Sequence, residues 1–137
     1  MKTIVFTITE KNLKVTPEKL EVEVGEDVSF EFVSSDPKLT KRRSMVTTII
    51  KFIGESPFKE ILFKLRPKLR RRGGPMRPRS NRFVIEGSIN LGTAEGIGEY
   101  KYDIIVNQNN DTIYEVDPYI EVVPSKELNA IENGILY

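Results

Sequence analysis

The chain of 137 residues contains neither cysteine nor histidine. Without these residues the protein has no disulfide, no thiol nucleophile, no Ser-His triad and no imidazole acid–base group. Blue-copper sites and the usual structural zinc sites require thiolate or imidazole ligands. We therefore expect no metal, no cofactor and no enzyme of these classes. The lack of cysteine is also typical of a cytoplasmic protein.

Long apolar runs are absent as well. No stretch reaches the roughly 18 apolar residues that a membrane-spanning helix needs. Residues 1–9 alternate apolar side chains with threonine, without the apolar run and small-residue cleavage site of a signal peptide. With 39% hydrophobic residues, a chain of this length is expected to form a single domain over residues 1–137, with its own core and no membrane partner.

Two runs in the C-terminal part of the chain alternate with the two-residue period of a half-buried β-strand. In Gly98–Val106, the side chains of Tyr100, Tyr102 and Ile104 share one face. Asp117–Val122 repeats the pattern and is expected to pair with the first run. These two strands, preceded by several others, predict an all-β sandwich of about seven strands.

The remaining chain supplies the other strands and their connections. Residues 58–65 fit either a strand or a short helix, and Gly25–Asp27 fits the turn of a hairpin or of a sheet-to-sheet corner. Residues 88–98 are expected to be a linker, and residues 107–111 a turn. A short C-terminal tail, with one or two helical turns over residues 125–134, follows. Further strands are expected over residues 3–8, 12–17, 20–24, 28–32, 45–53 and 83–87.

The net charge of +1 conceals a strong asymmetry along the chain. The Lys38–Arg82 region holds 15 Lys and Arg against 2 acidic residues, a balance of +13. The rest of the chain holds 6 basic and 18 acidic residues, a balance of −12. A division of this size within one domain points to an anionic partner for the basic region.

Residues 65–82 are the most basic part of this region and are expected to form a flexible loop. Three prolines, two glycines and eight basic residues disfavour a packed strand or helix. Guanidinium groups bind phosphate and carboxylate bidentately, and Arg70, Arg71 and Arg72 are expected to dominate. The alternative is a solvated loop that only balances the acidic sandwich. The candidate binding residues are Arg42, Arg43, Arg66, Lys68, Arg70, Arg71, Arg72, Arg77, Arg79 and Arg82.

The acidic residues give a weaker indication of chemistry. Several occupy outward strand positions, where carboxylates keep a sheet soluble, and no spacing singles out a catalytic pair. The turn over residues 107–111 has only one carboxylate, Asp111, so it is a poor calcium loop. We therefore expect a protein that is not an enzyme and has no metal site.

Four segments in order resemble the cupredoxin-like domains. Leu20–Phe30 is similar to their opening strands, and Ile50–Phe58 is similar to their middle segment. Gly98–Val106 resembles the strand that leads into the copper loop, and Asp117–Val122 resembles the ending of metal-free bacterial members. The resemblance implies a Greek-key β-sandwich, and the basic loop over residues 65–82 is expected to be an insertion in it.

The copper ligands of that family are missing here. Counting along the strand, Ile104 stands where the cysteine of the copper-binding members lies, and Asn107 stands where the histidine lies. Blue copper needs a thiolate and two imidazoles. The resemblance therefore implies a metal-free cupredoxin-like domain without electron-transfer function.

Taken together, the sequence predicts a non-catalytic binding module whose basic loop contacts an anionic partner. Nucleic acid is the first expectation and an acidic protein surface is the second. Aromatic residues are absent between Phe63 and Phe83, so stacking on unpaired bases is not expected. The alternative is a structural or regulatory subunit that docks into a larger protein assembly through a sandwich edge or through its C-terminal tail, Ile135–Tyr137.

Overall fold

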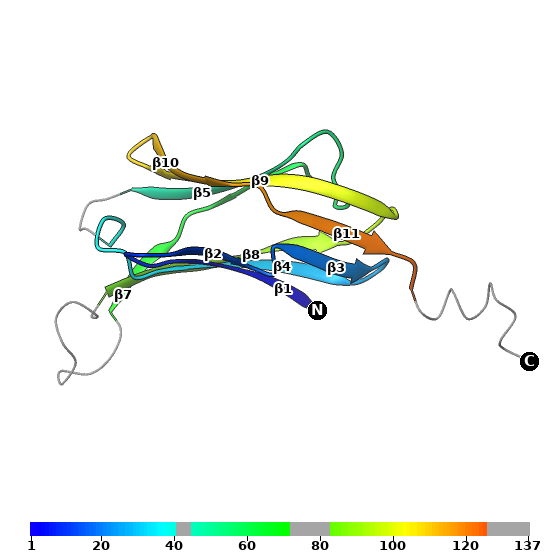
Figure 1. Ribbon diagram of the computed structural model, residues 1–137, viewed down its shortest axis with the longest axis horizontal. Helices are drawn as coiled ribbons and strands as arrows, with labels where there is room; N and C mark the ends of the chain where they lie inside the picture. Colours follow the sequence, from blue (N-terminus) through cyan, green and yellow to red (C-terminus); the bar gives the residue numbers. More distant parts are fainter. Residues whose placement is uncertain (41–44, 72–82, 126–137) are drawn as a thin grey trace, which may run out of the picture.

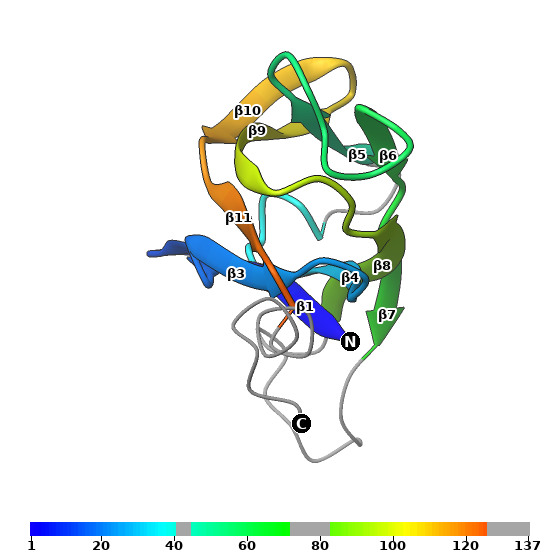
Figure 2. The ribbon, with the colours of Figure 1, turned by 90° about the vertical axis from the view of Figure 1, so that its right-hand side faces the viewer.

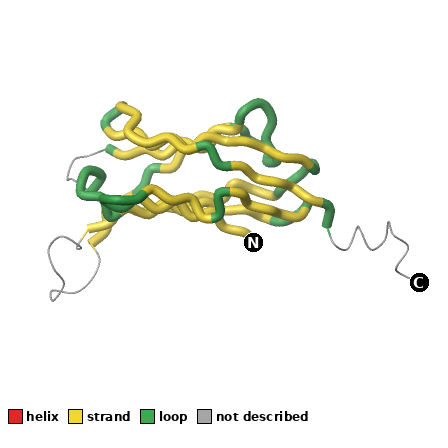
Figure 3. Tube along the Cα trace, viewed as in Figure 1, coloured by secondary structure: helices red, strands yellow, loops and turns green. Residues whose placement is uncertain are grey.

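The computed structural model describes residues 1–40, 45–71 and 83–125, which form two β-sheets packed face to face as a sandwich (Figures 1 and 3). None of these residues forms a helix that could cross a membrane. The strands are β1 (Lys2–Ile8), β2 (Leu13–Thr16), β3 (Lys19–Glu23), β4 (Asp27–Ser34), β5 (Val46–Phe52), β6 (Leu62–Leu65), β7 (Lys68–Arg71), β8 (Phe83–Thr93), β9 (Gly98–Gln108), β10 (Asp111–Val116) and β11 (Tyr119–Val123).

Both sheets mix parallel and antiparallel pairs. The first sheet has the order β2-β1-β4-β8-β7, in which only β1 and β4 are parallel. The second has the order β3-β11-β9-β5-β6, with β10 also paired to β9, and its parallel pair is β11 and β3. The short connection between β6 and β7 passes from the second sheet to the first, so these two edge strands lie on the same flank (Figure 2).

The core lies between the sheets and follows the alternation in the sequence. On β9 the side chains of Tyr102, Ile104 and Val106 are fully buried, and Tyr100 on the same face is half-buried. The predicted facing of this strand is therefore confirmed, as is its pairing with β11, where Ile120 lies opposite Tyr100. Each sheet buries one face. A strand whose side chains alternate with a two-residue period can therefore form backbone hydrogen bonds within its sheet and bury every second side chain in the core.

Aromatic rings fill the part of the core that lies against β5 and β6. The ring of Phe52 lies 5.2 Å from that of Tyr102 and 5.6 Å from that of Phe58, measured between centroids. Phe63 completes the group at 6.4 Å from Phe52. Tilted and edge-to-face contacts at such distances add to the free energy gained by burial.

The turn after β3 carries the chain from the second sheet to the first, so it is a sheet-to-sheet corner rather than a hairpin. Gly25 has a φ of +94°, which favours glycine over residues with a side chain. The Gly25 N–H donates to the Ala94 carbonyl at 2.9 Å, and the Ala94 N–H donates to the Glu26 carbonyl at 2.8 Å. These two hydrogen bonds to Ala94, the residue that follows β8, thus fix the corner.

Three sequence-based expectations were wrong. The described residues form eleven strands rather than about seven, and the expected linker over residues 88–98 is largely strand, because β8 continues to Thr93. The expected loop over residues 65–82 is wrong at Lys68–Arg71, which form β7. These segments have weak strand propensity, but each forms backbone hydrogen bonds with a neighbouring strand: residues 88–93 of β8 pair with β4, and β7 pairs with β8.

Of the remaining expectations, the structure decides those for residues 58–65 and for the β9–β10 turn. Residues 58–65, which fitted either a strand or a short helix, end in the strand β6. The turn between β9 and β10 is confirmed, with positive φ at Asn109 and Asn110. The expected helical turns over residues 125–134 and the tail Ile135–Tyr137 lie beyond the described residues, as does the remainder of the basic loop, residues 72–82.

The close approach of the β6–β7 connection to β8 depends on Gly87. A Cβ atom at Gly87 would lie 3.1 Å from Leu65 Cδ1 and 3.3 Å from the Cα of Pro67. Both distances are shorter than an ordinary van der Waals contact. Glycine at this position therefore lets the chain cross between the sheets next to β8.

Tyr102 offers a stability test. Its side chain is fully buried and its hydroxyl has no hydrogen-bond partner among the described residues. Burial also raises the pKa of Tyr102, so the hydroxyl stays protonated. We expect Tyr102→Phe to raise the free energy of unfolding by about 1–3 kcal/mol in urea titrations, because an unsatisfied buried hydroxyl is removed.

The matched control is Tyr100→Phe on the same strand. The Tyr100 hydroxyl donates to the Gly96 carbonyl at 2.9 Å, so its removal should lower stability slightly. Equal or lower stability of Tyr102→Phe relative to wild type would contradict the prediction.

Candidate functional site

The strands that precede the two most basic parts of the sequence, β4 and β7, end at the same end of the sandwich (Figure 1). The connections from β4 to β5 and from β7 to β8 both leave the sheets there, next to the β9–β10 turn. The strand register agrees, because Val33 near the end of β4 and Lys68 on β7 both lie opposite Glu86 of β8. Two strands about 30 residues apart in the sequence thus flank β8 and end at the same end of the sheet.

Four basic side chains occupy alternate positions from β6 to β7. Lys64, Arg66, Lys68 and Arg70 are all exposed, whereas Leu65 between the first two is buried. The two-residue period of extended chain places such side chains on the outward side. The row runs from the outer face of the second sheet, over the flank, to the outer face of the first. We call these four residues the basic flank.

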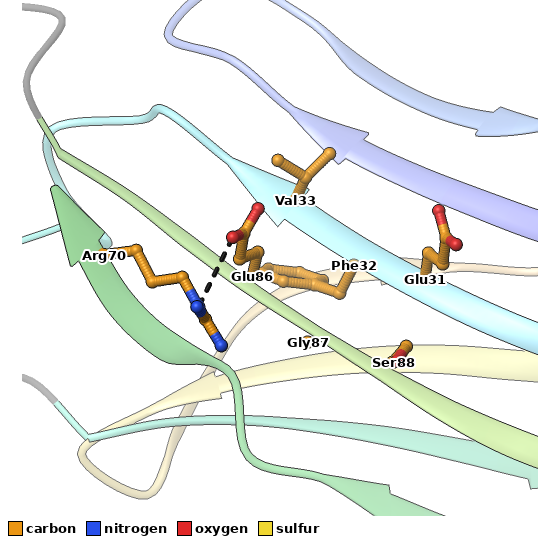
Figure 4. Close-up of a pocket in the computed structure, with 7 residues that line it drawn as sticks. All are labelled: Glu31, Phe32, Val33, Arg70, Glu86, Gly87 and Ser88. Atoms are coloured by element: carbon orange, nitrogen blue, oxygen red, sulfur yellow. Dashed lines mark ion pairs between the residues drawn. The ribbon is translucent and has the colours of Figure 1, made fainter. Parts of the chain in front are cut away.

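Arg70 reaches over the outer face of the first sheet towards a carboxylate. Its Nε lies 3.4 Å from Oε1 of Glu86, and both side chains are partly exposed (Figure 4). An exposed ion pair of this kind contributes only about 0–1 kcal/mol. Replacing Glu86 by another anion as the partner of the Arg70 guanidinium would therefore cost little free energy.

A shallow groove of about 410 Å³ lies beside this ion pair. Residues of β4, β7 and β8 line it, with the carboxylates of Glu31 and Glu86 and the guanidinium of Arg70 (Figure 4). Two carboxylates against one cation make the groove itself unfavourable for an anion. The groove itself therefore adds no attraction for an anion.

The turn that carries Lys38 is held by a buried carboxylate. Asp36 is only 2% exposed, and its Oδ1 accepts a hydrogen bond of 3.0 Å from the Lys38 N–H. Its Oδ2 accepts a hydrogen bond of 2.7 Å from the Tyr114 hydroxyl on β10. This bond raises the pKa of Tyr114, with a further contribution from burial. Asp36 thus links the β4–β5 connection to the second sheet.

The β9–β10 turn fixes the same connection from the other side. The backbone N–H of Asn109 donates to the Met45 carbonyl at 2.9 Å, and the Met45 N–H donates to the Asn109 side chain at 3.0 Å. The Gln108 side chain donates to the Lys38 carbonyl. The chain is therefore anchored both before and after residues 41–44.

The structure places only some of the predicted binding residues. Arg66, Lys68 and Arg70 are exposed on the basic flank, and Arg71 continues the backbone of β7. Sequence reasoning missed Lys64, which the alternation of basic residues from 64 to 70 could have revealed. The following predicted residues lie outside the described part of the chain: Arg42, Arg43, Arg72, Arg77, Arg79 and Arg82.

Three carboxylates gather on the second sheet, on β9 and β10 and at the residue that follows β10. Asp103, Glu115 and Asp117 each have an oxygen within 4.8 Å of the others, so together they could hold a cation. Partial burial raises the pKa of Asp103, and the hydrogen bond and charge of Asp117 raise it further. Lys51, opposite Asp103 on β5, acts against this shift.

Comparisons with known proteins give no family. No family model matches the sequence, and no curated protein matches it. Among solved structures, the chain is similar to the cysteine protease inhibitor EhICP2 from Entamoeba histolytica, with 10% sequence identity and a TM-score of 0.40. The match covers 90% of this chain and 97% of the inhibitor. This similarity carries no inference about function.

Tyr114 provides a test of the anchored turn. We expect Tyr114→Phe to lower the free energy of unfolding by about 1–3 kcal/mol, because a buried Asp36 oxygen loses its hydroxyl donor. Urea titrations of Tyr114→Phe, Asp36→Ala and the double variant would measure the coupling energy between the two side chains. Strictly additive losses would show that the hydrogen bond contributes nothing.

Asp103 provides a test of pH dependence. Because the pKa of this acid is higher in the folded protein than in the unfolded chain, the folded state binds the proton more tightly. Stability is then lost as the pH rises from the ordinary aspartate value, about 3.9, through the raised one. At pH 7 we expect Asp103→Asn to melt at a higher temperature than wild type.

The difference in melting temperature should shrink as the pH falls below about 4, where wild-type Asp103 is protonated. Asp111→Asn is the matched control, since Asp111 is exposed at the start of β10. An Asp103→Asn variant that melts at or below the wild-type temperature at pH 7 would argue against net repulsion in this cluster.

Proposed function

We propose that this protein is a non-catalytic binding module whose basic flank contacts an anionic partner. The observation that carries the proposal is the row of four exposed cations at alternate positions on one flank, with Glu86 as the carboxylate paired to one of them. Extended chain places successive members of such a row about 6.6 Å apart. A partner with regularly spaced charges, such as a nucleic acid or an acidic protein surface, suits this arrangement.

The distribution of acidic residues supports a directional contact. The β3–β4 and β8–β9 connections, which are hydrogen-bonded to each other, lie at the other end of the sandwich from the end of β7 (Figure 1). Glu26 and Glu95 belong to these connections, and Asp27 begins β4. An anionic partner would be repelled there and attracted at the basic flank. This separation of charge orients an approaching polyanion even though the net charge is only +1.

We also propose that the sandwich is a Greek-key, metal-free cupredoxin-like domain of the cytoplasm. The segments that carry the sequence resemblance form β3 and β4, β5 with the connection that follows it, β9 and β11, in that order. Ile104, at the position of the copper-binding cysteine, is fully buried in the apolar core. Its burial fits a structural role for this position in a domain without copper.

A second candidate function rests on a different surface. Ile53, Ile61 and Ile97 are each more than half exposed on the connections at the acidic end. These connections are joined, because the Glu95 N–H donates to the Pro57 carbonyl at 2.7 Å. Exposed apolar side chains of this kind favour a structural or regulatory subunit that docks into a larger assembly.

The proposal is tested by titrating the protein with labelled duplex DNA, RNA and polyglutamate at several salt concentrations. Replacing all four residues of the basic flank by Gln should weaken binding at low salt by tenfold or more. If the flank neutralises about four phosphates of duplex DNA, log affinity should fall with log salt with a slope near −3 to −4.

The matched control variant replaces four lysines outside the basic flank by Gln, so it has the same net charge as the flank variant. If this control weakens binding as much as the flank variant, or if wild type binds none of the three polyanions, the proposal fails. A docking function through the exposed isoleucines would then take its place. The control substitutions are Lys2→Gln, Lys11→Gln, Lys14→Gln and Lys59→Gln.

A further inference from the structure

We infer that the anionic partner is an extended acidic peptide that adds as a strand to the open edge of β7. This inference rests on the proposed function and specifies the partner of the same surface. Strand addition uses backbone hydrogen bonds for affinity and alternate side chains for specificity. The following observations distinguish β7 from a surface that binds through charge alone.

β7 is the last strand of the first sheet. Within the described residues it pairs with β8 and with no other strand. An edge strand of this kind presents a row of backbone N–H and C=O groups on its outer side. Another extended chain can therefore continue the sheet by bonding to these groups.

The side chains of β7 determine which chain fits. Lys68 and Arg70 lie opposite Glu86 and Val84 and point to the outer face of the sheet. Leu69 lies between them on the inner side, opposite Ile85, and remains 42% exposed. An added strand brings its side chains to within about 5 Å of those on β7. It should therefore carry acidic, apolar and acidic residues in succession.

The other edges lack this combination. On β6, Lys64 is the one cation, next to the exposed Leu62. On β2 the one cation is Lys14. On β3, Lys19 is paired at 2.9 Å with Glu121, and the exposed Glu21 would repel an acidic chain. β10, which pairs with β9 alone, carries no cation. Among the edge strands of the described residues, only β7 combines two outward cations with a half-exposed apolar side chain.

The same charges disfavour pairing between two copies of this edge. If β7 of one molecule paired with β7 of another, Lys68 and Arg70 would lie opposite the basic side chains of the second copy, and such like-charge pairs are destabilising. Pro67 and the length of four residues limit the edge further. A nucleic acid could use the two cations, but it has neither peptide groups for the edge nor an apolar side chain for Leu69.

The experiment uses the full chain and three blocked peptides with the core sequence Glu-Val-Glu-Val-Glu. One is unmodified, and the other two carry backbone N-methyl groups on alternate residues, in complementary sets. Strand addition directs alternate N–H groups to the edge, so one methylated peptide should bind like the parent and the other at least tenfold more weakly. Binding is measured by isothermal titration, together with amide exchange of Leu69 and Arg70.

Two variants locate the contact. Lys68→Glu with Arg70→Glu should abolish binding of the unmodified peptide, and Leu69→Ser should weaken it severalfold without changing the binding of polyglutamate. Lys14→Glu on the opposite edge of the same sheet is the matched control and should change binding little. The bound peptide should slow amide exchange in β7.

The outcomes separate this inference from the proposed function. Equal affinity of both methylated peptides, or unchanged amide exchange in β7, would overturn strand addition while leaving an electrostatic contact. Binding of DNA without binding of the peptide would also overturn it and would favour nucleic acid as the partner. Failure of every polyanion and every peptide would overturn both proposals together.

Discussion

The structure depends on the burial of β9 at the centre of the second sheet. Its backbone bonds to β5 on one side and to β10 and β11 on the other, while Tyr102, Ile104 and Val106 project into the core. Each of these side chains is removed from water only if the first sheet covers it. The packing of one sheet on the other therefore fixes where every edge, turn and flank of the molecule can lie.

The basic flank follows from this packing. Where β6 ends, Leu65 points into the core, so the basic residues on either side of it must face outwards. The chain then crosses to the first sheet beside Gly87, which has no side chain to obstruct the crossing. Burial of the apolar residues thus produces an ordered row of charges. The function that we propose depends on this order more than on the number of basic residues.

Two kinds of interaction position the chain near the basic flank. Buried polar contacts, such as the hydrogen bond between Asp36 and Tyr114, hold the β4–β5 connection against the second sheet. Exposed contacts, such as the ion pair between Arg70 and Glu86, hold a side chain only weakly. The first kind maintains the shape of this end of the sandwich. The second kind leaves the charges available to the anionic partner that we propose.

The sequence by itself determined the strands whose side chains alternate, because a half-buried strand needs that period. It therefore predicted β1, β4 and β9 with their facing. It failed at Lys68–Arg71, where basic residues and neighbouring prolines indicate a loop, because only β8 supplies the partner that makes this segment a strand. Only the tertiary structure decided that Gly25 lies at a corner and that β4 and β7 end at the same end of the sandwich. Both depend on which strands become neighbours, and non-local backbone pairing leaves no local pattern in the sequence.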